Sequence, residues 1–385
     1  MGARLTKLQL AARAPSALAA LLDVAAKDVK LRARGATGVD LVVSAVGQTF
    51  AVEVVATAAA GLIAARAEHV AEAAKKLRRH AIPLLGVPFM GEAGRRACEA
   101  ARVSWFDLGG NAHIVAPGIR VIIDGRPNRF RGPGRPASIF APKSARVVRW
   151  LLMHPARAFT QREIARAVDM REGFVSRIVA RLEEDGYLTR VDVSGEGDGD
   201  GRGYGYGSGA GAGDGDGSGS GGRHQGKAAV RVLDPSLLLD AWREEYQFDK
   251  HTLIQGHIAA RSGDALARFV SDRLVAENVE HAATGLAAAW QLTHFAAFRI
   301  ATFFVTSEPS ATLKEKLSFR EDARGANLWL VVPNDAGVFH GADDRGGIRC
   351  VHPVQAYLDL KAHPERAAEA AERLRSEFLS WKRNA

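Results

Sequence analysis

The sequence predicts a multidomain α/β protein in which two α/β domains lie on either side of a small helical unit. Short apolar runs alternate with Ala-rich helical stretches before residue 125. After residue 236 come helical patterns, then strand patterns in RIATFFV and ANLWLVVP, then GIRCVHPVQAYLDL and a helix at 364–381. With 385 residues, of which 47% are hydrophobic, the chain can bury two or three cores. We therefore divide it into an α/β domain at 1–124, a linker at 125–138, a central unit at 139–235 and an α/β or α+β domain at 236–385.

The N-terminal region carries both helical and strand patterns. Residues 1–30 have Arg, Lys and Asp among their apolar positions, which predicts an amphipathic helix pair and neither a signal peptide nor a membrane span. Helices are expected at 56–79 and in GEAGRRACEAA. Strands are expected in VDLVVSAV, TFAVEVV, AIPLLGVPF, VSWFDL and NAHIVAPGIRVIID.

Charge and cysteine usage narrow the class of protein. The formal net charge is +9, and residues 125–190 hold 14 Lys and Arg against 6 Asp and Glu, which indicates a surface for a polyanion. Cys98 and Cys350 are far apart in the sequence and form no CxxC motif, so we expect neither a disulfide framework nor a zinc site. A cytoplasmic location without membrane contact follows as an expectation.

The linker GRPNRFRGPGRPAS combines Pro, Gly and Arg without apolar periodicity, which is typical of an extended connector. Arg131 and Arg135 are DNA-contact candidates in it. Two interpretations remain open: an arm that carries Arg into a minor groove, or a charged linker that adds nonspecific phosphate contacts.

A second low-complexity stretch, residues 194–226, is rich in Gly and Asp and cannot bury enough apolar surface to become ordered. The flanking runs YLTRVDV and AAVRVLD both alternate as strands do. We therefore predict a disordered insertion at the tip of an enlarged hairpin, with a plain linker as the alternative.

The segment TQREIARAVDMREGFVSRIVARLEEDGYL, residues 160–188, predicts a helix-turn-helix. Thr160 and Glu163 can form a capping box at the start of the first helix. Asp169 lies at the turn, where a left-handed backbone is required and Asp is tolerated. SARVVRWLLMHP supplies a preceding helix and GYLTRV a first wing strand, so residues 139–235 are expected to form a winged helix-turn-helix.

The second helix of this motif, residues 171–184, is expected to read a major groove. Arg171 and Arg177 are the candidates for base edges, because Arg can donate two hydrogen bonds to guanine. Glu172 and Ser176 lie on the same polar face. The candidates for positions nearer the phosphates are Thr160, Gln161, Arg181 and Arg190.

Two acidic residues of the N-terminal domain suggest a different chemistry. In TGVDLVVSAVGQTFAVEVVA, residues 37–56, Asp40 and Glu53 lie on neighbouring predicted strands, where two carboxylates can hold Mg²⁺. The segment resembles the restriction-endonuclease-like PD-(D/E)xK fold in these acids and in strand order. That resemblance implies a Lys two residues after Glu53, but Val55 occupies this position. We therefore expect a nuclease-like scaffold without cutting activity, and Lys75 and Lys76 as the nearest replacements.

Three stretches of the C-terminal domain, together with their order, carry a further resemblance: TGLAAAWQLTHFA, FREDARGANLWLVVPNDAGVF and VHPVQAYLDLKAHPERAAEAAERLR. They resemble the AbiEi family of antitoxins of type IV toxin-antitoxin systems and related transcriptional regulators. The resemblance implies a DNA-binding repressor that often controls its own operon beside a nucleotidyltransferase toxin, without required contact between the two proteins. Gln355 and Asp359 lie in these stretches and receive no role.

Our first hypothesis is a cytoplasmic transcriptional regulator, not an enzyme, that binds double-stranded DNA as a homodimer and needs no cofactor or metal. The first alternative is a metal-dependent DNA endonuclease using Asp40 and Glu53. The second alternative is an accessory subunit that targets a larger assembly to DNA.

Overall fold

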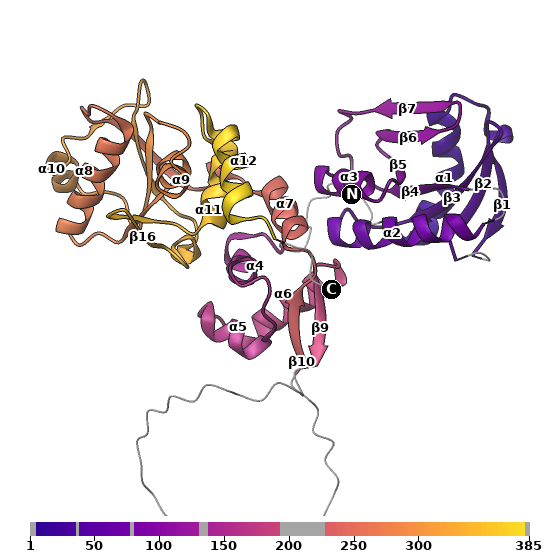
Figure 1. Cartoon of the computed structure of the whole chain (residues 1–385), viewed down its shortest axis with the longest axis horizontal. Coiled ribbons are helices and arrows are strands. Elements are labelled where there is room, and N and C mark those ends of the chain that lie inside the picture. The colour runs from indigo at the N-terminus through magenta and orange to yellow at the C-terminus, as the bar shows by residue number, and fades with distance from the viewer. Residues whose placement is uncertain (1–4, 36–37, 78–80, 131–137, 193–227, 382–385) are drawn as a thin grey trace, which may run out of the picture.

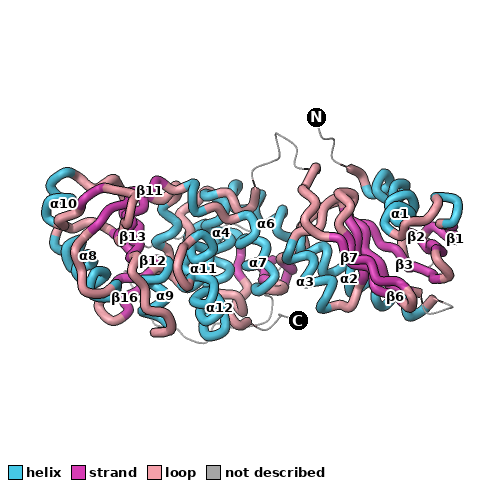
Figure 2. Tube along the Cα trace, turned by 90° about the horizontal axis from the view of Figure 1, so that it is seen from above, coloured by secondary structure: helices cyan, strands magenta, loops and turns pink. Residues whose placement is uncertain are grey.

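The computed structural model describes residues 5–35, 38–77, 81–130, 138–192 and 228–381. Figure 1 shows three parts: an α/β part at the N-terminal end, a small helical part in the centre, and a second α/β part. The central part lies between the other two along the long axis. Figure 2 shows the same order from above.

The N-terminal part is a seven-stranded sheet in sequential order with helices on both faces. Its first three strands are antiparallel, and the third pairs in parallel with the fourth and the fourth with the fifth. The strands are β1 (Lys30–Arg34), β2 (Leu41–Ala45), β3 (Gln48–Val54), β4 (Ile82–Val87), β5 (Ser104–Asp107), β6 (Ala112–Ala116) and β7 (Ile119–Ile123).

The two faces of this sheet have separate cores because side chains alternate along each strand. Helix α1 (Lys7–Leu21) packs with Phe50 and Val52 on one face. Helices α2 (Ala60–Lys76) and α3 (Glu92–Ala100) pack with Ala51 and Val55 on the other. Val55, which stands where the nuclease resemblance implies a lysine, is therefore a core residue.

The expected helix pair at residues 1–30 was wrong. One helix, α1, begins after a Thr6–Gln9 capping box and continues through Pro15. A 3-10 turn (Ala26–Asp28) follows, and β1 begins at Lys30. β1 was missed because KLRAR reads as a helix end, whereas its pairing with β2 determines its structure.

The central part is a winged helix-turn-helix. Helices α4 (Pro142–Met153), α5 (Gln161–Ala167) and α6 (Glu172–Glu184) pack beside a sheet of β8 (Phe159–Thr160), β10 (Ala228–Val232) and β9 (Leu188–Asp192). β9 and β10 pair antiparallel from Leu188–Val232 to Asp192–Ala228, which confirms the predicted hairpin. In Figure 1 this hairpin points away from the two α/β parts. The insertion at 194–226 lies outside the described residues.

The C-terminal part contains a mixed seven-stranded sheet of order β14-β11-β15-β13-β12-β17-β16. Its strands are β11 (Thr252–His257), β12 (His281–Thr284), β13 (Ala301–Val305), β14 (Arg320–Glu321), β15 (Leu328–Val332), β16 (Asp343–Arg345) and β17 (Ile348–Cys350). Its helices are α7 (Pro235–Glu245), α8 (Gly263–Ala276), α9 (Gly285–Thr293), α10 (Ala311–Lys316), α11 (Pro353–Asp359) and α12 (Ala367–Phe378). Strands β13 and β15 were expected from RIATFFV and ANLWLVVP, but β11 and β12 lie in a region that we had interpreted as helical.

One hydrophobic cluster joins the central and C-terminal parts. It contains Val148 and Leu152 of α4 together with Trp242 of α7 and Tyr357 of α11. Burial of a shared apolar surface holds the winged helix-turn-helix and the C-terminal part together. No helix among the described residues is long and apolar enough to cross a membrane.

Candidate nucleic-acid interface

The turn between α5 and α6 has the geometry that the sequence predicts. The Thr160 hydroxyl accepts a hydrogen bond from the Glu163 N–H at 3.2 Å, and the Glu163 carboxylate accepts one from the Thr160 N–H at 2.7 Å. Asp169 has φ +49°, in the left-handed region. These local features determine the start of α5 and the angle at which α6 leaves the turn.

Helix α6 has one buried face and one exposed face. Val175, Val179 and Leu182 are fully buried and Ile178 nearly so. The other face carries Arg171, Glu172, Gly173 and Arg177, all exposed, and Ser176, which is half-buried. A helix of this kind can enter a major groove with its N-terminal half while its apolar face remains on the core.

Arg171 and Arg177 are available for a DNA ligand. Neither guanidinium lies within salt-bridge distance of a carboxylate among the residues that the structure describes. Arg177 lies over the Phe174 ring, 5.5 Å from its centroid, which limits the directions in which the side chain can extend. Two such cations on an exposed helix face can donate to guanine O6 and N7.

The phosphate candidates are more strongly engaged within the protein. Arg181 Nε lies 2.9 Å from Asp185 Oδ2, and Arg190 Nε lies 2.7 Å from Glu183 Oε1. The Glu183 carboxylate raises the pKa of Arg190 by hydrogen bonding and by its charge. The Thr160 hydroxyl donates to Glu163 as part of the cap. Gln161, the first residue of α5, is half-buried.

Arg131 and Arg135 lie outside the described residues, so their role stays a prediction. The structure adds Arg162 and Arg166, which are exposed on α5. Arg162 Nε lies 3.6 Å from Glu172 Oε2 and thus connects α5 to the N-terminus of α6. A helical projection of QREIARA would have identified both residues, because Ile164 and Ala165 define the buried face.

Asp40 and Glu53 do lie together, but basic side chains surround them. Lys7 Nζ is 2.8 Å from Asp40 Oδ1 and 3.5 Å from Glu53 Oε1. Arg66 Nη1 lies 3.5 Å from Glu53 Oε1, and His69 Nδ1 lies 3.7 Å from Oε2. The Val54 N–H donates to Asp40 Oδ2 at 2.9 Å. Both carboxylates are therefore already bound by basic side chains or by a backbone N–H of the N-terminal part.

This arrangement does not fit a divalent metal, which requires free carboxylate oxygens. Within the described ranges, no group of three His, Cys, Asp or Glu residues is placed to hold a metal ion. Lys75, which we expected to replace the missing lysine of the nuclease motif, pairs instead with Glu72: its Nζ lies 2.5 Å from Glu72 Oε1. The lysine near the acids is Lys7, which sequence spacing did not suggest because it lies 33 positions before Asp40. We derive no catalytic step at this cluster.

The N-terminal domain contacts the end of α6. A Cβ atom at Gly61, in the first turn of α2, would lie 2.6 Å from the carbonyl oxygens of Asp185 and Gly186. The Ala60 N–H donates to the Tyr187 hydroxyl at 3.2 Å. Burial raises the pKa of this hydroxyl well above its ordinary value. The position of the N-terminal domain is thus coupled to the turn that links α6 to the wing.

Gly61→Ala should weaken this contact, because the new methyl group meets backbone atoms that cannot rotate away. We expect the free energy of unfolding to fall by about 1–3 kcal/mol, as is usual for overpacking. Chemical denaturation measures this change, and small-angle scattering should show a larger radius of gyration. Gly173→Ala is the matched control, since a Cβ there meets nothing within 4 Å. An unchanged unfolding curve and scattering profile for Gly61→Ala would contradict the docking contact.

Two arginines of α4 bind side chains of the C-terminal part. Arg146 donates from Nε and Nη2 to the Asp335 carboxylate at 2.7 and 2.9 Å. One turn later, the buried Arg149 donates from Nη2 to Gln355 Oε1 at 2.6 Å. Because α4 packs against α5 and α6, these bonds connect the C-terminal part to α6.

Comparison with known proteins supports this geometry. Residues 141–203 match the MarR family, and residues 231–380 match a family described as transcriptional regulator, AbiEi antitoxin, type IV TA system. No curated protein and no solved structure matches the chain. The nuclease resemblance of residues 1–124 therefore stays a prediction.

The two matches coincide with the two parts that geometry singles out: the helix-turn-helix with its exposed arginines and the domain that holds its first helix. Both families consist of regulators. The chain is thus a DNA-binding transcriptional regulator in which one region matches the MarR family and another matches the AbiEi antitoxin family.

Proposed function

We propose that this regulator is a cytoplasmic repressor of its own promoter and binds a palindromic operator as a homodimer. The observation that carries this proposal is a pair of guanidinium groups, Arg171 and Arg177, on the exposed face of α6, neither of which has a carboxylate partner among the described residues. Their positions suit base edges in a major groove. The two free, buried cysteines agree with a reducing compartment.

The remaining candidates complete the proposed interface. Arg162 and Arg166 on α5, and Arg190 on the wing, supply cations on either side of α6 for phosphate contacts. Arg181 and Arg190 can exchange their carboxylate partners for phosphates, because surface ion pairs contribute little to stability. Gln161 and the capping Thr160 lie at the N-terminus of α5, and Glu172 and Ser176 beside the two reading arginines. The N-terminal domain acts as a docked scaffold without nuclease activity.

A type IV antitoxin function is the biological setting that we propose. The match of residues 231–380 to an AbiEi antitoxin of type IV systems supports this setting. In it, a neighbouring gene would encode a nucleotidyltransferase toxin. Direct contact between the two proteins is not required for this function. Silencing of the operon follows from operator binding, and deletion of the regulator should raise transcription of its own promoter.

A footprint of the purified chain on the DNA upstream of its gene, with and without Mg²⁺, tests this function. We expect a protected, uncut palindrome whose half-sites lie about one helical turn, roughly 10 base pairs, apart. Sedimentation of the complex should give two chains for each operator. The absence of any protected site would contradict the proposal. Metal-dependent breaks that vanish in Asp40→Ala would instead support the endonuclease alternative.

A further inference from the structure

Three of the four edge strands in the two seven-stranded sheets are protected against pairing with another chain. Strands β14 and β16, the edges of the C-terminal sheet, have two and three residues, all of them charged. Strand β1, one edge of the N-terminal sheet, carries Lys30 and Arg32, and its register with β2 shifts between Leu31 and Ala33. Short edges, charges and bulges are the usual means of preventing unwanted strand pairing.

The fourth edge strand, β7, is longer, more apolar and regular. Its five residues read IRVII and include one charge, Arg120. It pairs with β6 over five consecutive residue pairs without a bulge, and with no other strand among the described residues. Figure 1 shows it as the outermost strand of the N-terminal part. An edge strand of this kind is a template on which another strand can pair.

Backbone groups of β7 point away from the sheet at Arg120 and Ile122. The Val115 N–H donates to the Ser104 hydroxyl at 3.1 Å, and the Val115 carbonyl accepts from the same hydroxyl at 3.4 Å, so both groups point towards β5. Residues that face each other in an antiparallel pair alternate between exchanging two hydrogen bonds and none. Arg120 faces Val115 and Ile122 faces His113, so these two pairs exchange none. Their N–H and C=O groups are therefore available on the open edge.

One face of the sheet beside this edge also carries exposed apolar side chains. Trp105, His113 and Ile122 are in register and lie on the face that α2 and α3 cover. Arg95 of α3 lies over the Trp105 ring, 5.2 Å from its centroid. The next two strands are less covered, since Val115 of β6 is 50% exposed and Ile122 of β7 is 55% exposed.

Charge selects one register for the pairing of β7 with the β7 of a second copy. In an antiparallel pair about a two-fold axis, residues with open backbone groups must face each other. An axis at Arg120 would set two cations opposite each other, which is unfavourable. An axis at Val121 would set Arg120 opposite Ile122. An axis at Ile122 sets Arg120 of each copy opposite Asp124 of the other, and cross-strand pairs of opposite charge are stabilising.

Both charged groups are able to form this pair. Arg120 is exposed, and no carboxylate lies within salt-bridge distance of it in the described part of the chain. The Asp124 side chain is 64% exposed. Its Oδ1 accepts from Arg95 Nη1 at 2.5 Å and from the Gly125 N–H at 2.6 Å, whereas its Oδ2 accepts no hydrogen bond from a described residue. Oδ2 can therefore accept from a second guanidinium group.

We propose that β7 is the surface by which two copies of this chain associate. The two β7 strands pair antiparallel about a two-fold axis at Ile122 and join the two N-terminal sheets into one. Arg120 of each copy pairs with Asp124 of the other copy, and the two Ile122 side chains meet at the axis. This inference names the contact surface of the homodimer in the proposed function and rests on that function for its biological role.

Analytical ultracentrifugation of the full chain without DNA tests the association. A single strand pair is a small interface, so we expect a monomer–dimer equilibrium with Kd on the order of 10 μM. Ile122→Lys sets two like charges opposite each other at the axis and should raise this Kd at least tenfold. A chain that stays monomeric at about 100 μM, or an unchanged Kd for Ile122→Lys, would overturn the proposal.

Val46→Lys is the matched control for this measurement. Val46 is 51% exposed and belongs to the same domain, but it lies in the turn between β2 and β3. The substitution therefore adds the same charge at a similarly exposed apolar position away from β7, and this variant should dimerise as the original chain does. Equal weakening by Val46→Lys and Ile122→Lys would show an effect of net charge and overturn the proposal.

A mixing experiment tests the register. Arg120→Asp sets two carboxylates opposite each other, and Asp124→Lys sets two cations opposite each other, so each variant alone should be mainly monomeric. In a one-to-one mixture, each introduced charge meets an opposite charge of the other variant, and a heterodimer should form. Native mass spectrometry identifies it by its mass, and circular dichroism shows that both variants fold. Failure of two folded variants to form the heterodimer would overturn the register; if either does not fold, the contrast between Ile122→Lys and Val46→Lys still decides the proposal.

Operator binding separates this inference from the proposed function. A chain that dimerises through β7 but protects no operator would contradict the proposed function and leave the β7 contact intact. Two chains on the operator, together with an unchanged dimer Kd for Ile122→Lys, would place the homodimer contact elsewhere. That result would overturn the β7 contact and leave the proposed function intact.

Discussion

Replacing Arg171 and Arg177 together by alanine is expected to remove most of the sequence-specific DNA affinity. A well-placed bidentate contact to guanine contributes about 1–3 kcal/mol of discrimination. Loss of two such contacts should therefore weaken operator binding by a factor of at least about 30. Affinity for unrelated DNA should fall much less, since phosphate contacts supply it. Fluorescence anisotropy with operator and scrambled duplexes measures both quantities.

The matched control is Arg261→Ala combined with Arg320→Ala. These two arginines are exposed on the C-terminal part, so their removal changes net charge equally without altering α6. We expect operator affinity within about twofold of that of the original chain at the same salt concentration. If both double variants lost operator affinity equally, net charge and not the α6 face would explain DNA binding.

The second large effect is a loss of stability in mild acid. Burial lowers the pKa values of His251, His352 and His363 to about 4 each. Between pH 6.5 and 4, these histidines take up protons in the unfolded chain but not in the folded one. Their stabilising contribution is therefore complete above pH 6.5 and is lost as the pH falls towards 4.

Asp359 opposes this trend. Burial raises its pKa to about 7, so the folded chain already holds this proton where the unfolded chain gains it only near pH 4. From these four groups alone, three histidines less one carboxyl group leave a net uptake of about two protons on unfolding. The free energy of unfolding should then fall by roughly 3 kcal/mol per pH unit at the steepest point. Urea unfolding at pH 4.5, 5.5 and 6.5 measures this slope.

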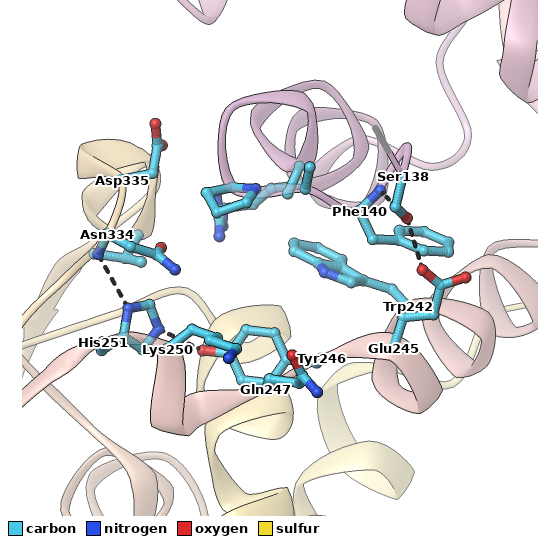
Figure 3. A pocket seen from close by; sticks show the side chains of 15 residues that line it. Ser138, Phe140, Trp242, Glu245, Tyr246, Gln247, Lys250, His251, Asn334 and Asp335 are labelled. Carbon is cyan, nitrogen blue, oxygen red and sulfur yellow. Dashed lines mark hydrogen bonds between the residues drawn. The ribbon is translucent and has the colours of Figure 1, made fainter. Parts of the chain in front are cut away.

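His251→Gln should flatten the slope, because glutamine has no proton to gain. His251 accepts the Asn334 N–H at Nδ1 and contacts the Tyr246 hydroxyl at Nε2, 3.0 Å away (Figure 3). His257→Gln, at the exposed end of β11, the strand that follows His251, is the matched control and should keep the original slope. Equal slopes for both variants and the original chain would contradict the role given to the buried histidine.

The helix-turn-helix could be predicted from sequence because its information is local. The Thr160–Glu163 box, Asp169 in the turn and the apolar spacing of α6 each concern residues a few positions apart. The paired runs on either side of the insertion also alternate visibly, so the hairpin could be found. Strands β11 and β12 could not, since their pairing with β15, β13 and β17 decides their structure.

Contacts between residues far apart in the sequence were also beyond sequence reasoning. Lys7 reaches Asp40 and Glu53 from a helix far away in sequence, and Gly61 meets Gly186 only after both domains fold. Arg149 did leave a signal. It falls with Ala145, Val148 and Leu152 on the buried face of α4, where a charged residue is rare unless it has a partner.

Methylation interference on the operator tests the central claim most directly. Dimethyl sulfate methylates guanine N7 in the major groove and adenine N3 in the minor groove, so it reports on contacts in each groove separately. If α6 reads bases through Arg171 and Arg177, methylated guanines in each half-site should block binding, and Arg171→Ala with Arg177→Ala should abolish this sensitivity. Interference confined to adenine N3, with no effect at any guanine N7, would contradict the account.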